Sequence, residues 1–71
     1  MSEHTRTPIE TIAAPYGREI RLDEIAYETG MTMMRVTIRE GARYTILEID
    51  PATARRWADV LGAWANKVSP A

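Results

Sequence analysis

The clearest structural pattern in the chain lies in residues 34–49, MRVTIREGARYTILEI. Apolar and polar residues alternate on both sides of Gly41, which is typical of two half-buried strands joined by a tight turn. Glycine as the first of the two central residues favours a type II′ turn, because that turn needs positive φ there. The turn predicts a register in which Arg35 faces Glu48 while the apolar side chains share the opposite face.

An earlier strand is predicted to pair with this hairpin. Residues 18–23 alternate in the same way, and their charges complement those of residues 34–39. Ile25 then falls out of phase, so we predict a one-residue β-bulge near Asp23-Glu24 that brings Ile25 opposite Met34. The alternative is that this strand ends at Asp23. With the bulge, the predicted inner face of the sheet consists of Ile20, Leu22, Ile25, Met34, Val36, Ile38, Leu47 and Ile49.

The N-terminal part of the chain is less sharply patterned. Pro8 and Pro15 bracket residues 9–14, which are predicted to form either a short edge strand or an extended arm, because proline cannot donate to a strand ladder. Residues 1–7 are polar, and we expect them to form a flexible tail. Residues 8–68 are then expected to form a single domain.

A helix is predicted after the hairpin. Asp50 is a good N-cap and Pro51 suits the first helical position, so the helix begins there and ends near Lys67. Apolar residues at spacings of three and four form a stripe of Ala54, Trp57, Ala58, Leu61, Trp64, Ala65 and Val68. The sequence therefore predicts an α+β fold, in which a three- or four-stranded antiparallel β-meander packs against one C-terminal amphipathic α-helix. We expect Trp57 and Leu61 to lie against Leu22, Val36 and Leu47 of the sheet.

The chemistry available to the chain is limited. There is no cysteine, the serines are Ser2 and Ser69, and the one histidine is His4 in the expected tail. A nucleophile–histidine pair or a metal site cannot be assembled from these on the folded part, so we expect no enzyme activity, no catalytic residue, no metal and no cofactor. The glycines match no phosphate-binding spacing.

Composition bounds the location and the partners. The net charge is −1, from nine Lys and Arg against ten Asp and Glu, which argues against a general polycation for nucleic acid. The apolar runs are too short to span a membrane. Residues 1–6 lack the apolar core of a signal peptide, so we expect a cytoplasmic protein.

Two resemblances add to this interpretation. The order of three strands and a Trp-bearing helix over residues 18–66, with the last strand running into Ile49-Asp50-Pro51, resembles the transcriptional coactivator family that binds single-stranded DNA. That resemblance implies a basic, aromatic sheet surface for nucleic acid, onto which Arg21, Arg35, Arg39 and Tyr44 would map. The Arg-Glu ladder and the Asp-Pro-Ala-Thr helix start also resemble small uncharacterised bacterial proteins, which implies a fold and no activity.

We expect a small non-enzymatic interaction or structural module that forms a homodimer, with single-stranded nucleic-acid binding as the alternative. The apolar arc of the helix is wider than one small sheet can cover, which leaves Val60 and Trp64 for a second copy. The expected interface also includes Ile9 and Ile12. The alternative oligomeric state is a monomer in which residues 9–14 cover Trp64.

Overall fold

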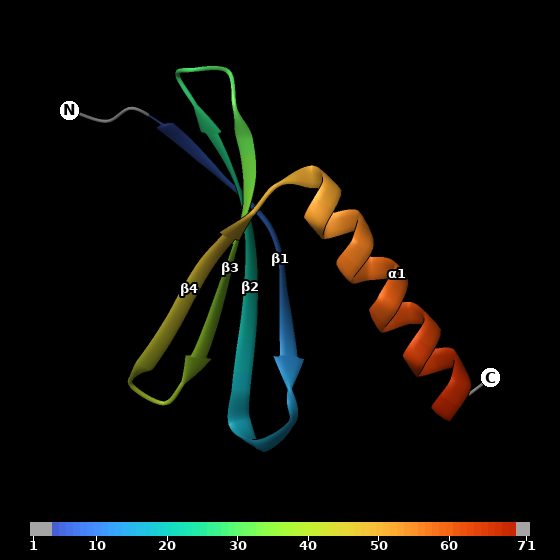
Figure 1. Ribbon diagram of the computed structural model, residues 1–71. Helices are drawn as coiled ribbons and strands as arrows, with labels where there is room; N and C mark the ends of the chain where they lie inside the picture. The colour runs from blue at the N-terminus through green and yellow to red at the C-terminus, as the bar shows by residue number, and fades with distance from the viewer. Residues whose placement is uncertain (1–3, 70–71) are drawn as a thin grey trace.

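Four strands follow one another as an antiparallel meander with the spatial order β1-β2-β3-β4, and one helix comes last (Figure 1). The structure is a computed structural model and describes residues 4–69. Its elements are β1 (His4–Ala14), a short 3-10 turn (Pro15–Gly17), β2 (Arg18–Tyr27), β3 (Thr32–Glu40), β4 (Arg43–Ile49) and α1 (Pro51–Val68). The predicted α+β class is confirmed, with four strands.

The hairpin of β3 and β4 has the predicted turn and register. Gly41 has a φ of 64°, in the left-handed region that a type II′ turn requires at its first central position. Val36 pairs with Leu47 and Arg35 with Glu48, so the two faces of the hairpin are as expected. Turn chemistry and side-chain alternation agree here, and together they leave one register.

The bulge predicted near Asp23-Glu24 is wrong. Strands β2 and β3 pair without interruption, and Ile25 lies opposite Met33 instead of Met34. Ile25 therefore shares a face with Asp23, and this is the side of the sheet away from the predicted inner face. The register shift of this sheet lies instead in β1, between Pro8 and Glu10. Proline cannot donate to the ladder, which makes it a natural place for such an irregularity.

Strand β1 is longer than expected. The flexible tail was predicted to reach residue 7, but residues 4–7 continue β1 and pair with β2, from His4 opposite Tyr27 onward. Residues 1–3 of that prediction lie outside the described residues. The predicted arm at residues 9–14 is part of this edge strand, so it is paired with β2 and does not cover Trp64.

Helix α1 begins as predicted and ends at Val68, one residue beyond the expected end. The Asp50 carboxylate accepts a hydrogen bond from the Thr53 backbone N–H at 2.9 Å, which is N-capping, and Pro51 occupies the first turn. Among residues 4–69, no helix is long and apolar enough to cross a membrane.

The sheet is strongly twisted, and its strands cross near their middle in Figure 1. We call the face that carries Leu22 and Val36 the helix-side face, because α1 lies over it, and the face that carries Asp23 and Ile25 the outer face. The buried hydrophobic residues of the described chain are Ile25 and Val36, one on each face. No residue of α1 is buried. The core of a single chain is therefore very small.

Candidate functional site

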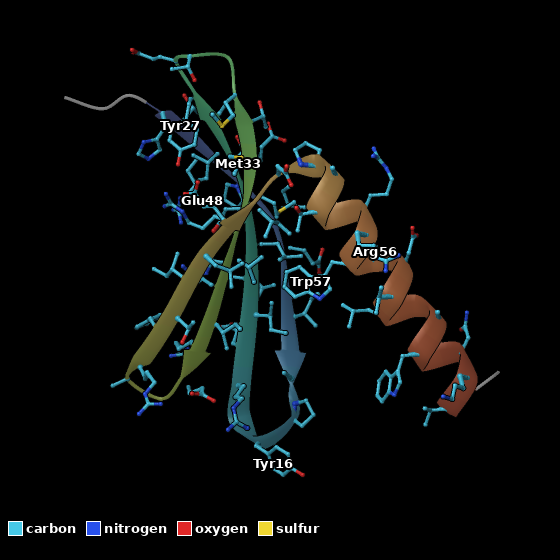
Figure 2. The ribbon with its side chains drawn as sticks, in the orientation of Figure 1. Tyr16, Tyr27, Met33, Glu48, Arg56 and Trp57 are labelled. Carbon is cyan, nitrogen blue, oxygen red and sulfur yellow. The ribbon has the colours of Figure 1, made fainter. Side chains whose placement is uncertain are left out.

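An apolar groove separates α1 from the helix-side face of the sheet. Figure 1 shows the helix leaving the end of β4 and running beside the sheet at an angle to it, and Figure 2 shows Trp57 reaching from the helix toward the strands. The groove has a volume of about 290 Å³. Its lining, entirely apolar in residue type, is Ile12, Ile20, Leu22, Met34, Val36, Ile49, Ala54, Trp57, Ala58 and Leu61. We refer to it as the helix–sheet groove.

The helix side of this groove is incompletely covered. Trp57 and Leu61 line the groove together with Leu22 and Val36, as predicted, but Leu47, which was also expected beneath them, is not in the lining. Leu61 keeps 52% of its surface exposed. Exposure rises further along the helix and reaches 62% at Trp64. Large apolar side chains gain about 1.5–3 kcal/mol each from full burial, so this stripe leaves much stabilisation unrealised in a single chain.

The total exposed surface of the chain also indicates that a single chain leaves apolar surface uncovered. The chain exposes 5665 Å², roughly a quarter more than the about 4,500 Å² expected for a compact monomer of 8.0 kDa. Its radius of gyration is 14.2 Å, against about 11 Å for a compact domain of this length. The surplus area exceeds the about 800 Å² that each partner buries in a standard protein–protein interface.

The four residues predicted for a dimer interface fall in different places. Val60 and Trp64 are exposed on α1, outside the lining of the groove, at 49% and 62%. Ile12 lines the groove from β1 and is 45% exposed. Ile9 is the residue skipped by the register shift in β1 and is 49% exposed. Of these four residues, only Ile12 lines the same groove as residues of α1. The dimer interface that they were predicted to form stays a prediction.

A polar cluster on the outer face bridges three strands. The Tyr27 hydroxyl donates to Glu48 Oε1 at 2.6 Å, and Arg35 donates to Glu48 Oε2 through Nε at 3.0 Å and Nη2 at 2.8 Å. The hydrogen bonds from Tyr27 and Arg35 lower the pKa of the Glu48 carboxyl, and the bond to Glu48 raises the pKa of the Tyr27 hydroxyl. Figure 2 shows Tyr27, Glu48 and Met33 close to one another in the upper half of the sheet.

Sequence reasoning missed Tyr27. A signal for it was present, since Asp23, Ile25 and Tyr27 alternate with period two and belong on one face unless a bulge intervenes. The assumed bulge moved Ile25 to the wrong face. Ile25 is fully buried on the outer face, where its register partners are Arg6 on β1 and Met33 on β3.

Asp23 lies beside this cluster and is only 1% exposed. Its Oδ2 is 3.8 Å from Arg6 Nη1, and Arg35 is its register partner on β3. Its Oδ1 has no hydrogen-bond partner among the described residues. The Arg6 guanidinium is the positive charge that partly compensates this buried carboxylate.

The residues predicted for nucleic acid share the outer face, but most of their charge is already paired. Arg35 binds Glu48, and Arg39 Nε lies 3.3 Å from Glu19 Oε1. Arg21 alternates with them on β2, and Tyr44 of β4, opposite Arg39, is 53% exposed. The arrangement offers an exposed aromatic ring and few free cations.

An open hollow of about 630 Å³ lies next to the turn between β2 and β3. Its walls include Met31 and Met33, and its carboxylates are Glu28 and Glu48. Glu48 is already bound to Tyr27 and Arg35. Within residues 4–69, no three His, Cys, Asp or Glu side chains gather closely enough to hold a metal ion.

Residues 3–67 match a family model described as "Family of unknown function (DUF6967)". No curated protein and no solved structure matches the chain. The match spans most of the chain, from β1 to the last turn of α1.

Proposed function

The chain belongs to this family of unknown function, DUF6967, and we propose that it is a non-enzymatic interaction module that acts as a homodimer. One observation carries the proposal: α1 presents an apolar stripe over an apolar sheet face, yet none of its side chains is buried. A small domain gains the core that it lacks by covering such a surface with a second copy. A single self-complementary patch is sufficient for a two-fold dimer.

The polar groups support a structural role better than a catalytic one. The chain has no cysteine, and Ser69 lies beyond the end of α1. The carboxylate with the most partners, Glu48, is held by Tyr27 and Arg35. A cytoplasmic location is also part of this proposal. Bacterial origin stays a prediction.

Sedimentation equilibrium from about 1 to 100 μM tests the proposal. We expect twice the mass of one 8.0 kDa chain, and a shift to one chain in Val60→Asp, because a charge on the apolar flank cannot be desolvated without penalty. Asn66→Asp is the matched control, since it adds the same charge on the polar face of α1 and should leave the dimer intact. A single-chain mass at every concentration rejects the proposal.

Single-stranded nucleic-acid binding is the second candidate. The observation that favours it is the exposed Tyr44 ring, at 53%, on the outer face. Arg21 and Arg39 lie on the same face. Bases stack on exposed aromatic rings, and phosphate contacts make affinity fall steeply with salt.

Electrophoretic mobility shift with single-stranded oligonucleotides over a salt series tests this candidate. Arg21→Ala and Tyr44→Ala should weaken binding, whereas Arg56→Ala, which removes a charge from α1, should not. Absence of a shift at low salt, or affinity that does not change with salt, excludes it.

A further inference from the structure

Trp64, the more exposed of the two tryptophans, is not part of the lining of the helix–sheet groove. Trp64 follows Trp57 by seven residues, so it lies about 10 Å further along the helix axis and about 20° around it. It therefore continues the same stripe, beyond Leu61, the last residue that lines the groove. With 62% of its surface exposed, Trp64 cannot fill the groove of its own chain.

A second copy of the chain can fill the helix–sheet groove and cover Trp64 at the same time. If two α1 helices pack antiparallel about a two-fold axis between Val60 and Leu61, position 64 of one helix lies level with position 57 of the other. Val60 of each copy then lies level with Leu61 of the other. Because the axis is two-fold, the same contact forms twice, and each chain supplies one groove and one tryptophan.

We propose that Trp64 of each copy inserts into the helix–sheet groove of the other, against Trp57. This rests on the homodimer proposed above and names the group that holds it together. The groove of about 290 Å³ has no polar residue in its lining and is open to solvent, so it can take the apolar body of an indole ring while the Nε1–H stays at the open side. Tryptophan is also the residue type most enriched among the buried anchors that dominate interface energies.

The other exposed aromatic residues are poorly placed for this role. Tyr16 is 92% exposed at the turn between β1 and β2, where Figure 2 shows it at the tip of the hairpin. Tyr44 lies on the outer face, on the side of the sheet away from the groove. Trp64 lies on the same apolar stripe of α1 as the groove residues Trp57 and Leu61 but outside the groove lining, so its ring is available to a second copy.

Fluorescence of Trp57→Phe tests the insertion, because Trp64 is then the sole tryptophan of the two in the sequence. We expect Trp64 emission at short wavelength at high concentration. On dilution, the emission should move to longer wavelength in step with the fall in mass measured by sedimentation. A dimer in which Trp64 emits at the same long wavelength at every concentration overturns the insertion and leaves the homodimer standing.

Trp64→Ala in the otherwise unchanged chain is the second arm. Loss of an interface anchor should weaken the dimer at least about 30-fold, while circular dichroism stays unchanged because the side chain is mostly exposed within one chain. Tyr44→Ala removes a comparably exposed ring from the outer face and should leave the dimer affinity unchanged. Equal affinity of Trp64→Ala and the parent rejects the insertion. A parent that is a single chain at every concentration rejects the homodimer as well.

Discussion

The sheet and helix α1 are stabilised in opposite ways. In the sheet, each strand pairs with its sequence neighbour, and the buried hydrophobic side chains of the described chain, Ile25 and Val36, lie on it. The helix has a good N-cap and regular backbone bonding, but it buries no side chain. Strand pairing is therefore completed within one chain, whereas one chain buries the apolar stripe of α1 only in part.

The strongest test of this contrast compares Ile25→Ala with Leu61→Ala. Ile25 is fully buried, so its truncation should reduce the free energy of unfolding by about 2–5 kcal/mol. Leu61 is 52% exposed, and within one chain its truncation should remove only about 1 kcal/mol. Urea unfolding of both variants at low protein concentration measures the difference. Equal losses would show that α1 packs as tightly as the sheet.

The turn of the hairpin provides the next test. Gly41 has positive φ, where a β-branched side chain is strained, so Gly41→Val should destabilise the fold by about 1–3 kcal/mol. For a domain of this size that corresponds to a fall in melting temperature of roughly 4–24 °C. Ala42→Val, at a position without positive φ, is the control. A Gly41→Val variant as stable as this control would argue against the strain.

A substitution at Gly62 tests whether any other part of the chain packs against that side of α1. A Cβ placed at Gly62 would meet no atom within 4 Å, and its φ is not positive. Alanine should therefore raise the free energy of unfolding by about 0.5–1 kcal/mol, because glycine is a poor helix former. Thermal unfolding at low concentration gives the sign. A loss of stability would mean that another part of the molecule approaches this side of α1.

The smallest expected effect concerns the Tyr27–Glu48–Arg35 cluster. Its hydrogen bonds hold the pKa of Glu48 below the ordinary 4.5. Such a depressed pKa contributes stability above the unfolded-state value, and this stability is lost as pH falls through the folded-state value. Unfolding by urea between pH 6 and 3 should therefore show a shallower acid loss in Glu48→Gln than in the parent. Glu24→Gln, at an exposed position, is the control and should follow the parent.

Much of the fold could be predicted because its determinants are local. The turn at Gly41, the pairing of Arg35 with Glu48 and the N-cap at Asp50 each depend on residues that are close in sequence or directly opposite in a hairpin. Each feature was also supported by two independent patterns, such as turn chemistry together with side-chain alternation. The candidate groove could be predicted in part, since Trp57 and Leu61 were expected against the sheet.

The wrong predictions concern how the strands pair and which face of the sheet is covered. Alternation placed Ile25 and Asp23 on one face of the strand, but the preference for an apolar inner face favoured a bulge that does not exist. The polar composition of residues 4–7 predicts a tail, but pairing with β2 keeps them in the edge strand. Polar composition says little about backbone pairing, which depends on the neighbouring strand.

Local sequence is sufficient to predict the β3–β4 hairpin with its turn and register and the apolar stripe of α1, because these follow from the backbone preferences and periodicity of neighbouring residues. Only the tertiary structure decided that the outer face buries Ile25 and that α1 leaves its stripe half-covered above an apolar groove. The physical reason is that coverage depends on the twist of four strands acting together and on the angle at which the helix departs. Neither quantity is specified by any one segment of the chain.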